Sequence, residues 1–276
     1  MTNNETQGLP AFITLCALTL LAAAGMLATS MPWWSHLPQT QASYLRHLAQ
    51  TASVDEQLLL NRFATWFDHD NPEAHLSIAQ ASLKLHDPVT GLNQLKFLPA
   101  NPTTVTLKAQ LLLEDNQPSA AVETITPITI DPLASEPTIV TACLAQAVMG
   151  QAPACGPLAG RVSSPEAITS ILRAQGDPIT LATALYANGL HLSTQRILSN
   201  EPVSPVRNLL LARIHYDLHT QTSLQSARDL LITATNLNPA SLEARQLLRM
   251  VYQDLDDLNG AATQSELIDR LTSGRP

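Results

Sequence analysis

Two groups of histidine and acidic side chains have the composition of a metal site. The first is the stretch DHDNPEAH, in which His69 and His75 stand among Asp68, Asp70 and Glu73. Imidazole and carboxylate groups are ligands for divalent metals. No pair in this stretch has the spacing diagnostic of a zinc site, so we expect a solvated turn followed by a helix start.

The second group is His215 and His219, four positions apart with Asp217 between them. Residues four apart lie on one face of a helix, where two histidines can bind the same metal ion. The sequence shows no third ligand beside them and no HExxH motif. We therefore expect one packed and one exposed histidine.

No catalytic motif accompanies these residues. Asp254, Asp256 and Asp257 fall at a helix end and in the following turn, and we interpret them as surface charge. The sequence contains no GxSxG, no P-loop and no GxGxxG in the context that dinucleotide binding requires. We predict no catalytic residue, no metal and no cofactor, and hence a protein that is not an enzyme.

Cys143 and Cys155 form a possible disulfide. Cys143 falls in an expected helix and Cys155 in the loop beyond it, and across a turn their Cα atoms can come within disulfide range. Closing so short a loop would stabilise the fold by about 3 kcal/mol in the chain-entropy model. The alternative is one buried and one incidental thiol.

Composition narrows the class of protein that carries these residues. The chain has 276 residues, a formal net charge of −8, and only 4% aromatic residues. Nucleic-acid binding needs clustered Lys and Arg, so the acidic balance argues against a nucleic-acid partner. Abundant Ala, Leu and Gln with few Gly favours an all-α fold.

The first element of the chain is a long apolar segment near the N-terminus. Residues 9–31 carry no charge and, at about 1.5 Å per residue, can cross a hydrocarbon core of about 30 Å as one helix. The tail at 1–8 has no Lys or Arg, so the basic region of a secretory signal is missing. Trp33 and Trp34 then match an interfacial belt. We predict a transmembrane helix at 9–31, with a signal cleaved near Met31 as the alternative.

The orientation of this span is weakly encoded. Arg46 is the first basic residue after it, which by charge bias alone places the body in the cytoplasm. A short tail, one span and a Lys-poor body are more typical of an exported domain. We therefore expect a single-pass protein of the inner (cytoplasmic) membrane with a periplasmic body.

After the span, helical segments alternate with short turns. Residues 32–70 hold a linker and the first helices, and 71–276 hold a solenoid of helix pairs that is irregular in 137–203. Pro102 and Pro132 close successive pairs 30 residues apart, and Ala227 and Ala261 stand 34 residues apart in the last two pairs. A fixed period near 34 is typical of a helical repeat array, and the 30-residue units are short. The expected helices are 38–52, 54–67, 72–85, 90–98, 103–114, 119–126, 138–149, 165–174, 178–189, 193–198, 205–218, 224–237, 240–255 and 260–271, with a loop at 150–157.

The best-formed unit resembles the tetratricopeptide repeat (TPR) family. Its first helix has large apolar residues, and its second carries Ala227, Ala234 and Pro239 at the family's spacing. The family's small residue in the first helix is replaced by His215 here and by Arg249 in the next unit. The positions that carry the resemblance are Leu211, Ile214, Leu218, Ala227, Leu231, Ala234, Pro239, Leu248, Tyr252, Ala261 and Ile268 and, more loosely, Ile78, Ala79, Gly91, Leu95, Leu98, Pro102, Ala109, Leu112, Ala121, Ile125, Ile128 and Pro132.

This resemblance implies an α-α superhelix whose concave face is built by the first helix of each pair. The residues expected on that face, and hence to contact a partner, are Gln80, Lys84, Gln110, Glu114, Tyr216, His219, Gln246, Met250 and Gln253. We expect a membrane-anchored scaffold that binds other proteins and assembles or stabilises a cell-envelope complex.

Three other functions remain open at the level of sequence. One is a complex subunit whose groove is filled by a constant neighbour. Another is a periplasmic holdase for exported chains, which a broad exposed apolar groove would favour over a polar one. The third, an envelope enzyme built on a helical superhelix, would need a catalytic Glu in a separate globular part, and no spare segment exists to house it.

Overall fold

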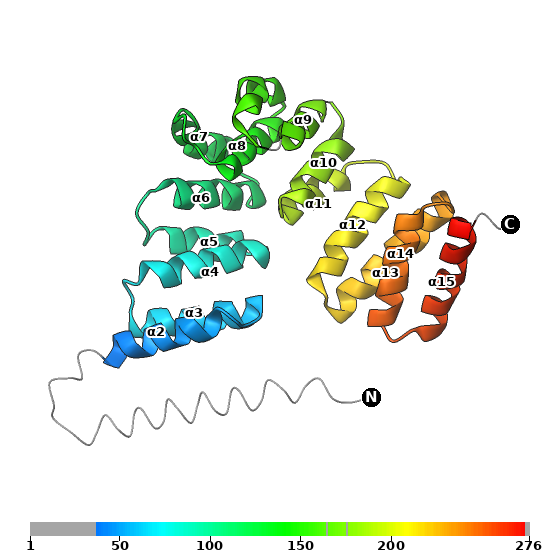
Figure 1. The fold of residues 1–276 in the computed structure, drawn as a ribbon, viewed down its shortest axis with the longest axis horizontal. Helices are drawn as coiled ribbons and strands as arrows, with labels where there is room; N and C mark the ends of the chain where they lie inside the picture. The colour runs from blue at the N-terminus through cyan, green and yellow to red at the C-terminus, as the bar shows by residue number, and fades with distance from the viewer. Residues whose placement is uncertain (1–36, 164, 175, 274–276) are drawn as a thin grey trace, which may run out of the picture.

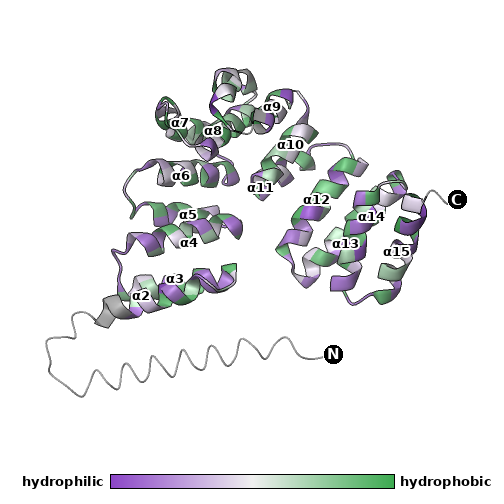
Figure 2. Ribbon diagram, in the orientation of Figure 1, coloured by the Kyte–Doolittle hydropathy of each residue, from purple (hydrophilic) through white to green (hydrophobic). Residues whose placement is uncertain are grey.

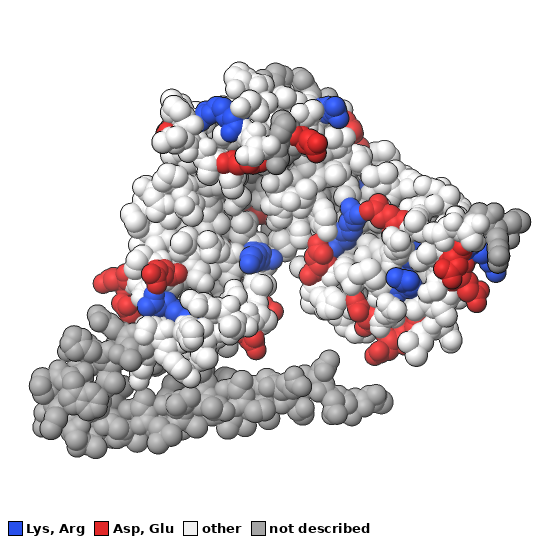
Figure 3. All heavy atoms as spheres, viewed as in Figure 1, with Lys and Arg blue, Asp and Glu red and all other residues white. Residues whose placement is uncertain are grey.

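The computed structural model describes residues 37–163, 165–174 and 176–273, and this part of the chain is all helical with no strand. Successive helices pack as antiparallel neighbours and form an arch (Figure 1). Residues 37–129 make one limb, residues 205–273 make the other, and Figure 3 shows a notch between them. The expected array of stacked helix pairs is therefore confirmed as an architecture.

The helix bounds agree closely with the expected segments in both limbs. The first limb contains α2 (Leu37–Ala49), α3 (Val54–Phe67), α4 (Pro72–Lys84), α5 (Pro88–Leu95), α6 (Pro102–Glu114) and α7 (Pro118–Thr129). The middle contains α8 (Glu136–Val148), η2 (Ala152–Arg161), α9 (Pro165–Arg173), α10 (Pro178–Ala187) and α11 (His191–Ser199). The second limb contains α12 (Pro205–Leu218), α13 (Gln221–Leu237), α14 (Leu242–Asp254) and α15 (Leu258–Ser273).

Proline and a preceding polar residue set most helix starts. Pro102, for example, is the first residue of α6, and the side chain of Asn101 accepts a hydrogen bond from the backbone N–H of Thr104 at 3.0 Å. Proline suits this position because the first helical N–H has no partner within the helix. Pro102, expected to close one helix pair, therefore also opens the next pair, whereas Pro132 and Pro239 lie in the turns before α8 and α14.

The turns inside the helix pairs share one backbone feature. Six of them contain a residue with positive φ: His86, Asn116, Gly150, Gly189, His219 and Asp256. In five of these turns, all but the one at His219, the next backbone N–H bonds five residues back, as from Asp87 to the carbonyl of Ser82 at 2.8 Å. This is the Schellman motif, which satisfies the last carbonyls of a helix and reverses the chain. The repeat is thus marked by a left-handed residue at each of these turns.

Small residues stand where neighbouring helices approach closely. Ala79, Ala121, Ala227 and Ala234 are fully buried. A Cβ on Gly91 would lie 2.8 Å from both Cδ atoms of Leu111, so a larger side chain there would displace the side chain of Leu111. Figure 2 shows hydrophobic and hydrophilic residues mixed along the helices of both limbs, as expected of helices that bury one face.

Two segments, η2 in the middle of the chain and the end of α7 in the first limb, depart from our expectations. The segment expected as a loop at 150–157 lies in the 3-10 helix η2, which is packed on α8 and tied to the end of α7 because Arg161 donates to the carbonyls of Thr129 and Asp131. Helix α7 also continues through Pro127, three residues beyond its expected end. A proline near the end of a helix removes only one backbone bond, and packing on α8 compensates for it.

Among the described residues, no helix combines the length and the apolar character that a membrane crossing requires. The span expected at 9–31, together with Trp33 and Trp34, lies outside the described residues. Both therefore stay predictions.

Candidate functional site

Most residues expected to contact a partner lie on the free side of the first helices. On α14, Gln246, Met250 and Gln253 are exposed and stand opposite the buried stripe of Ala244, Leu248 and Val251. Gln80 and Lys84 are likewise exposed on α4. We call this surface the first-helix face; it comprises Gln80, Lys84, Gln110, Tyr216, His219, Gln246, Met250 and Gln253.

Neighbouring first helices are linked along this face. The side-chain amide of Gln110 on α6 donates to Oγ1 of Thr141 on α8 at 3.3 Å. In the other limb, His219 lies 3.9 Å from a carboxylate oxygen of Asp254 and packs edge-on against Tyr216. Burial and a hydrogen bond to Asp254 raise the pKa of Tyr216. Gln110 is therefore linked to α8, and Tyr216 and His219 are linked to α14 through Asp254; the binding of a partner by these residues stays a prediction.

Glu114 is the exception and corrects our expectation. Its side chain is only 1% exposed, and its carboxylate accepts a hydrogen bond from the backbone N–H of Leu192 at 2.8 Å. Helix α11 has no capping side chain of its own, so Glu114 caps its first turn from 78 positions away. It cannot contact a partner directly.

The contact between α6 and α11 closes the apex of the arch. Besides the Glu114 bond, the hydroxyl of Ser193 donates to the carbonyl of Leu113 at 2.8 Å, and Arg196 donates to the carbonyl of Glu114 at 3.1 Å. The C-terminal end of α6 and the N-terminal end of α11 thus satisfy each other's unpaired backbone groups. The junction fixes how the two limbs face each other.

A cluster of titratable side chains surrounds this junction. The rings of His86 and His191 are 4.4 Å apart, and His191 stacks on Tyr186 at 5.1 Å. The hydroxyl of Tyr186 donates to Asp217 at 2.8 Å, and Arg213 lies over its ring at 6.0 Å. The cluster is built by the turn between α4 and α5 and by α10, α11 and α12, so it lies at the apex, where the first limb meets the second.

Burial sets the protonation of Glu114 at the junction and of the histidines of the cluster. It raises the pKa of Glu114 from 4.5 to about 7, against the opposing effect of the backbone bonds from Leu192 and Ser193. Burial and the neighbouring His191 lower the pKa of His86 to about 4. Within the described part of the chain, Glu114 Oε1, His86 Nδ1 and His191 Nδ1 are buried without a hydrogen-bond partner. Unpaired buried atoms make the junction sensitive to pH.

The stretch around His69 and His75 is not arranged to bind a metal. His75 is 2% exposed, its Nδ1 lies 2.7 Å from the side-chain oxygen of Gln94, and its Nε2 lies 2.6 Å from the carbonyl of His69. Phe97 stacks on the His75 ring at 4.6 Å. Across the described ranges, no group of three or more His, Cys, Asp or Glu is placed to hold a metal ion.

His215 and His219 are separated in the way we expected. His215 is half-buried, which lowers its pKa, whereas His219 is exposed and ends α12 in a left-handed conformation. Of the three aspartates interpreted as surface charge, Asp254 lies beside His219, and Asp257 accepts from the backbone N–H of Gly260 at 2.9 Å. These residues cap and link helices.

Cys143 and Cys155 are both fully buried and are free thiols in this structure. A hydrogen bond between them and burial raise the pKa of the Cys143 thiol above its usual value, and Cys155 donates to Gln146 at 3.1 Å. The two sulfur atoms are therefore neighbours, and the disulfide itself stays a prediction.

Alkylation distinguishes the two states of this thiol pair. We use a Cys16→Ser background so that only Cys143 and Cys155 remain of the three cysteines. If the body is exported and oxidised, unfolding without reductant should expose no reactive thiol, and unfolding with reductant should expose two. Two labelled thiols without reductant would discard the bridge, because buried thiols become reactive on unfolding whether or not they were neighbours.

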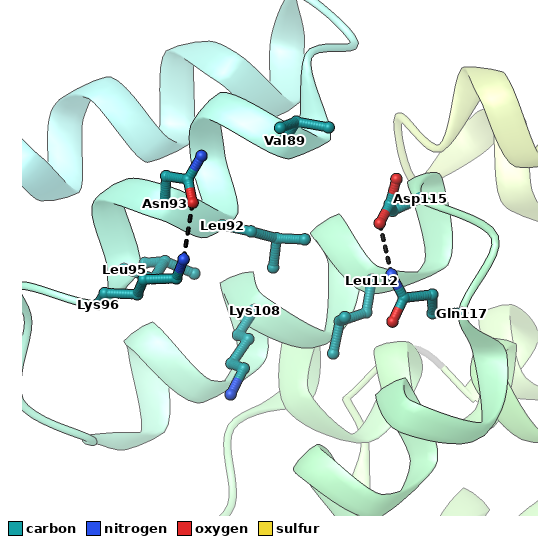
Figure 4. Close-up of a pocket in the computed structure, with 9 residues that line it drawn as sticks. All are labelled: Val89, Leu92, Asn93, Leu95, Lys96, Lys108, Leu112, Asp115 and Gln117. Carbon is teal, nitrogen blue, oxygen red and sulfur yellow. Dashed lines mark hydrogen bonds between the residues drawn. The ribbon is translucent and has the colours of Figure 1, made fainter.

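One open cavity lies between α5 and α6. Its volume is about 390 Å³, and Figure 4 shows Leu92, Leu95 and Leu112 beside the polar side chains of the rim. The ammonium group of Lys96 turns to Asn93, at 2.8 Å, and that of Lys108 points away from Leu92 (Figure 4). The two charges do not converge on one point, so the cavity is not a pre-formed anion site.

Sequence reasoning missed the apex cluster of His86, Tyr186, His191, Arg213 and Asp217. These residues come from segments up to about 130 positions apart, and none belongs to a motif. The only local signal was a histidine in the turn at His86, where a left-handed conformation is needed.

Comparison with known proteins adds no relative. No protein-family model matches the chain, and no curated protein sequence is similar to it. Its assignment to a helical repeat architecture therefore rests on the stacked helix pairs themselves.

Proposed function

We propose that this protein is a membrane-anchored, TPR-like scaffold whose first-helix face binds other proteins and so assembles or stabilises a cell-envelope complex. Residues 9–31 form the anchor, and the body lies in the periplasm. The observation that carries the proposal is the row of exposed polar side chains on the first helices of both limbs, on either side of a notch.

The chemistry of this face favours a scaffold over a holdase. Gln80, Lys84, Gln246 and Gln253 offer hydrogen bonds to an extended or helical partner segment. Met250, 38% exposed, supplies an adaptable apolar contact among them. A general holdase would need a broad apolar groove instead. The alternative of a complex subunit, whose groove is filled by a constant neighbour, uses the same mode of binding but with a permanent partner.

Membrane attachment and the side occupied by the body are tested together. Membranes are first washed with salt and alkali, which should leave the protein in place because insertion of a transmembrane helix is effectively irreversible. Protease is then added to intact spheroplasts, and we expect digestion of the helical body.

The other outcomes separate the two parts of the proposal. Release on washing would mean that residues 9–31 are a cleaved signal. Retention with full protection from protease would place the body in the cytoplasm and would remove the oxidising environment that the Cys143–Cys155 bridge requires.

A further inference from the structure

We infer that the N-terminal end of the helix array, formed by the pair α2 and α3, rests on the lipid surface of the membrane through Tyr44 and Trp66. The inference rests on the proposed anchor, and it adds a second membrane contact, made by the folded body. Its basis is the set of exposed apolar side chains on this end pair, two of them aromatic.

Four large apolar side chains are exposed on the end pair. Tyr44 and Leu48 stand four apart on α2 and are 56% and 38% exposed, and Leu59 and Trp66 stand seven apart on α3 and are 48% and 75% exposed. Helix α2 packs against α3, whose buried Asn61 bonds to Ser77 of α4. Among the residues that the structure describes, no further helix pair covers the free side of this pair.

The opposite end of the array is different. The exposed side of α15 carries Thr263, Glu266, Asp269 and Arg270, with Leu258 and Leu271 only near its two ends. Terminal units of a solenoid need such a polar outer side to remain soluble. The N-terminal pair also carries exposed charged residues, Asp55, Glu56 and Arg62 on α3, but it differs from α15 in exposing the aromatic rings of Tyr44 and Trp66. Exposed Tyr and Trp rings are typical of a site that meets an apolar surface.

The path of the chain points to the membrane as that apolar surface. Between Met31, the end of the expected span, and Leu37, the start of α2, lie only five residues, which reach at most about 20 Å when extended. Helix α3 runs antiparallel to α2, so its end at Phe67 lies beside the start of α2. Trp66 is thus on the part of the body held nearest to the membrane.

The residue types suit an interface. Tyr and Trp have apolar rings with one polar group and concentrate where hydrocarbon meets water. Asp68 and Asp70 follow directly after α3, so we expect contact with zwitterionic lipid rather than attraction to an anionic surface.

The test uses Trp66 as a natural probe. The chain has three tryptophans, so Trp33→Phe with Trp34→Phe leaves Trp66 alone in the full-length protein. This variant is reconstituted into phosphatidylcholine vesicles with or without lipids brominated on their acyl chains, and the vesicles are floated. We expect the protein to float and its Trp66 emission to fall at least twofold with brominated lipid.

A matched control sits at the far end of the array. Leu258 is 75% exposed, the same fraction as Trp66. In a chain in which all three tryptophans are phenylalanine, Leu258→Trp should give emission that brominated lipid leaves unchanged.

Two results would overturn the inference, and they are distinguishable. If the protein floats but the emission of Trp66 is not quenched, the anchor is supported and the second membrane contact is rejected. If Trp66 is then also protected from quenching by aqueous acrylamide, it is covered by protein and not by lipid. Failure to float would reject the proposed anchor, and the inference with it.

Discussion

Glu114→Gln should remove the contribution to stability that Glu114 makes as the pH falls from 8 to 5. The pKa of Glu114 is raised by burial from 4.5 in the unfolded chain to about 7 in the folded protein. A carboxyl whose folded pKa is raised stabilises the fold fully below pH 4.5, and this stability is lost as the pH rises through 7. At about 1.4 kcal/mol per pH unit of separation, the contribution between pH 8 and pH 5 is about 2–3 kcal/mol.

His86 should act in the opposite direction. Its pKa is lowered from 6.5 to about 4, so its contribution is present above pH 6.5 and is lost as the pH falls through 4. Because the ring is partly exposed, we discount the effect to about 1 kcal/mol. The pKa values of His191 and His215 are also lowered by burial, and these groups add to the same trend.

Urea unfolding at pH 8 and pH 5 separates the two groups. The free energy of unfolding of Glu114→Gln, taken relative to the unchanged protein, should fall by about 2–3 kcal/mol between pH 8 and pH 5, because only the unchanged protein gains stability by taking up a proton at position 114. His86→Asn, which keeps a residue tolerant of the left-handed conformation, should shift the other way by about 1 kcal/mol. Identical pH profiles for all three proteins would mean that the apex is not buried as described.

Leu231→Ala should destabilise the second limb by about 2–5 kcal/mol. Leu231 is fully buried on α13 and belongs to the cluster that includes Ala212, Ala227 and Leu248. Truncation leaves a cavity that rigid neighbouring helices cannot close. Ile232, the next residue, is 37% exposed, so Ile232→Ala is a matched control with a smaller expected loss.

Hydrogen exchange shows where this destabilisation acts. In a solenoid each pair contacts only its neighbours, so Leu231→Ala should increase exchange in α12–α15 more than in α4–α6. Equal losses of protection in both limbs would show that the arch unfolds as one unit. A loss no larger than that of Ile232→Ala would contradict the packing of α13.

Local sequence signals predicted most of the fold. Helices α3 and α12 have the bounds expected from their apolar spacing and flanking polar residues. The small residues Ala227 and Ala234, expected at a close helix contact, are fully buried. These features depend on neighbours in the same pair, which the spacing of apolar residues reports directly.

The remainder depends on contacts between distant segments. Glu114 looks like an exposed residue of α6 by periodicity, and only its bond to Leu192, 78 positions away, explains why it is buried. The same holds for η2, whose conformation follows from packing on α8 and from Arg161 reaching back to α7. The sequence around a polar residue does not reveal which distant residue that side chain bonds to in the folded protein.

The central claim is that the first-helix face is where a partner protein binds, and site-specific photo-crosslinking tests it most directly. A photoreactive amino acid is placed at Gln246 or Gln253 on this face, or at Leu133, which is 90% exposed in the connection after α7. The full-length protein is then irradiated in its own membranes. We expect discrete cross-linked products from positions 246 and 253 and none from position 133. Products from position 133 alone, or none from either position on the first-helix face, would contradict the account.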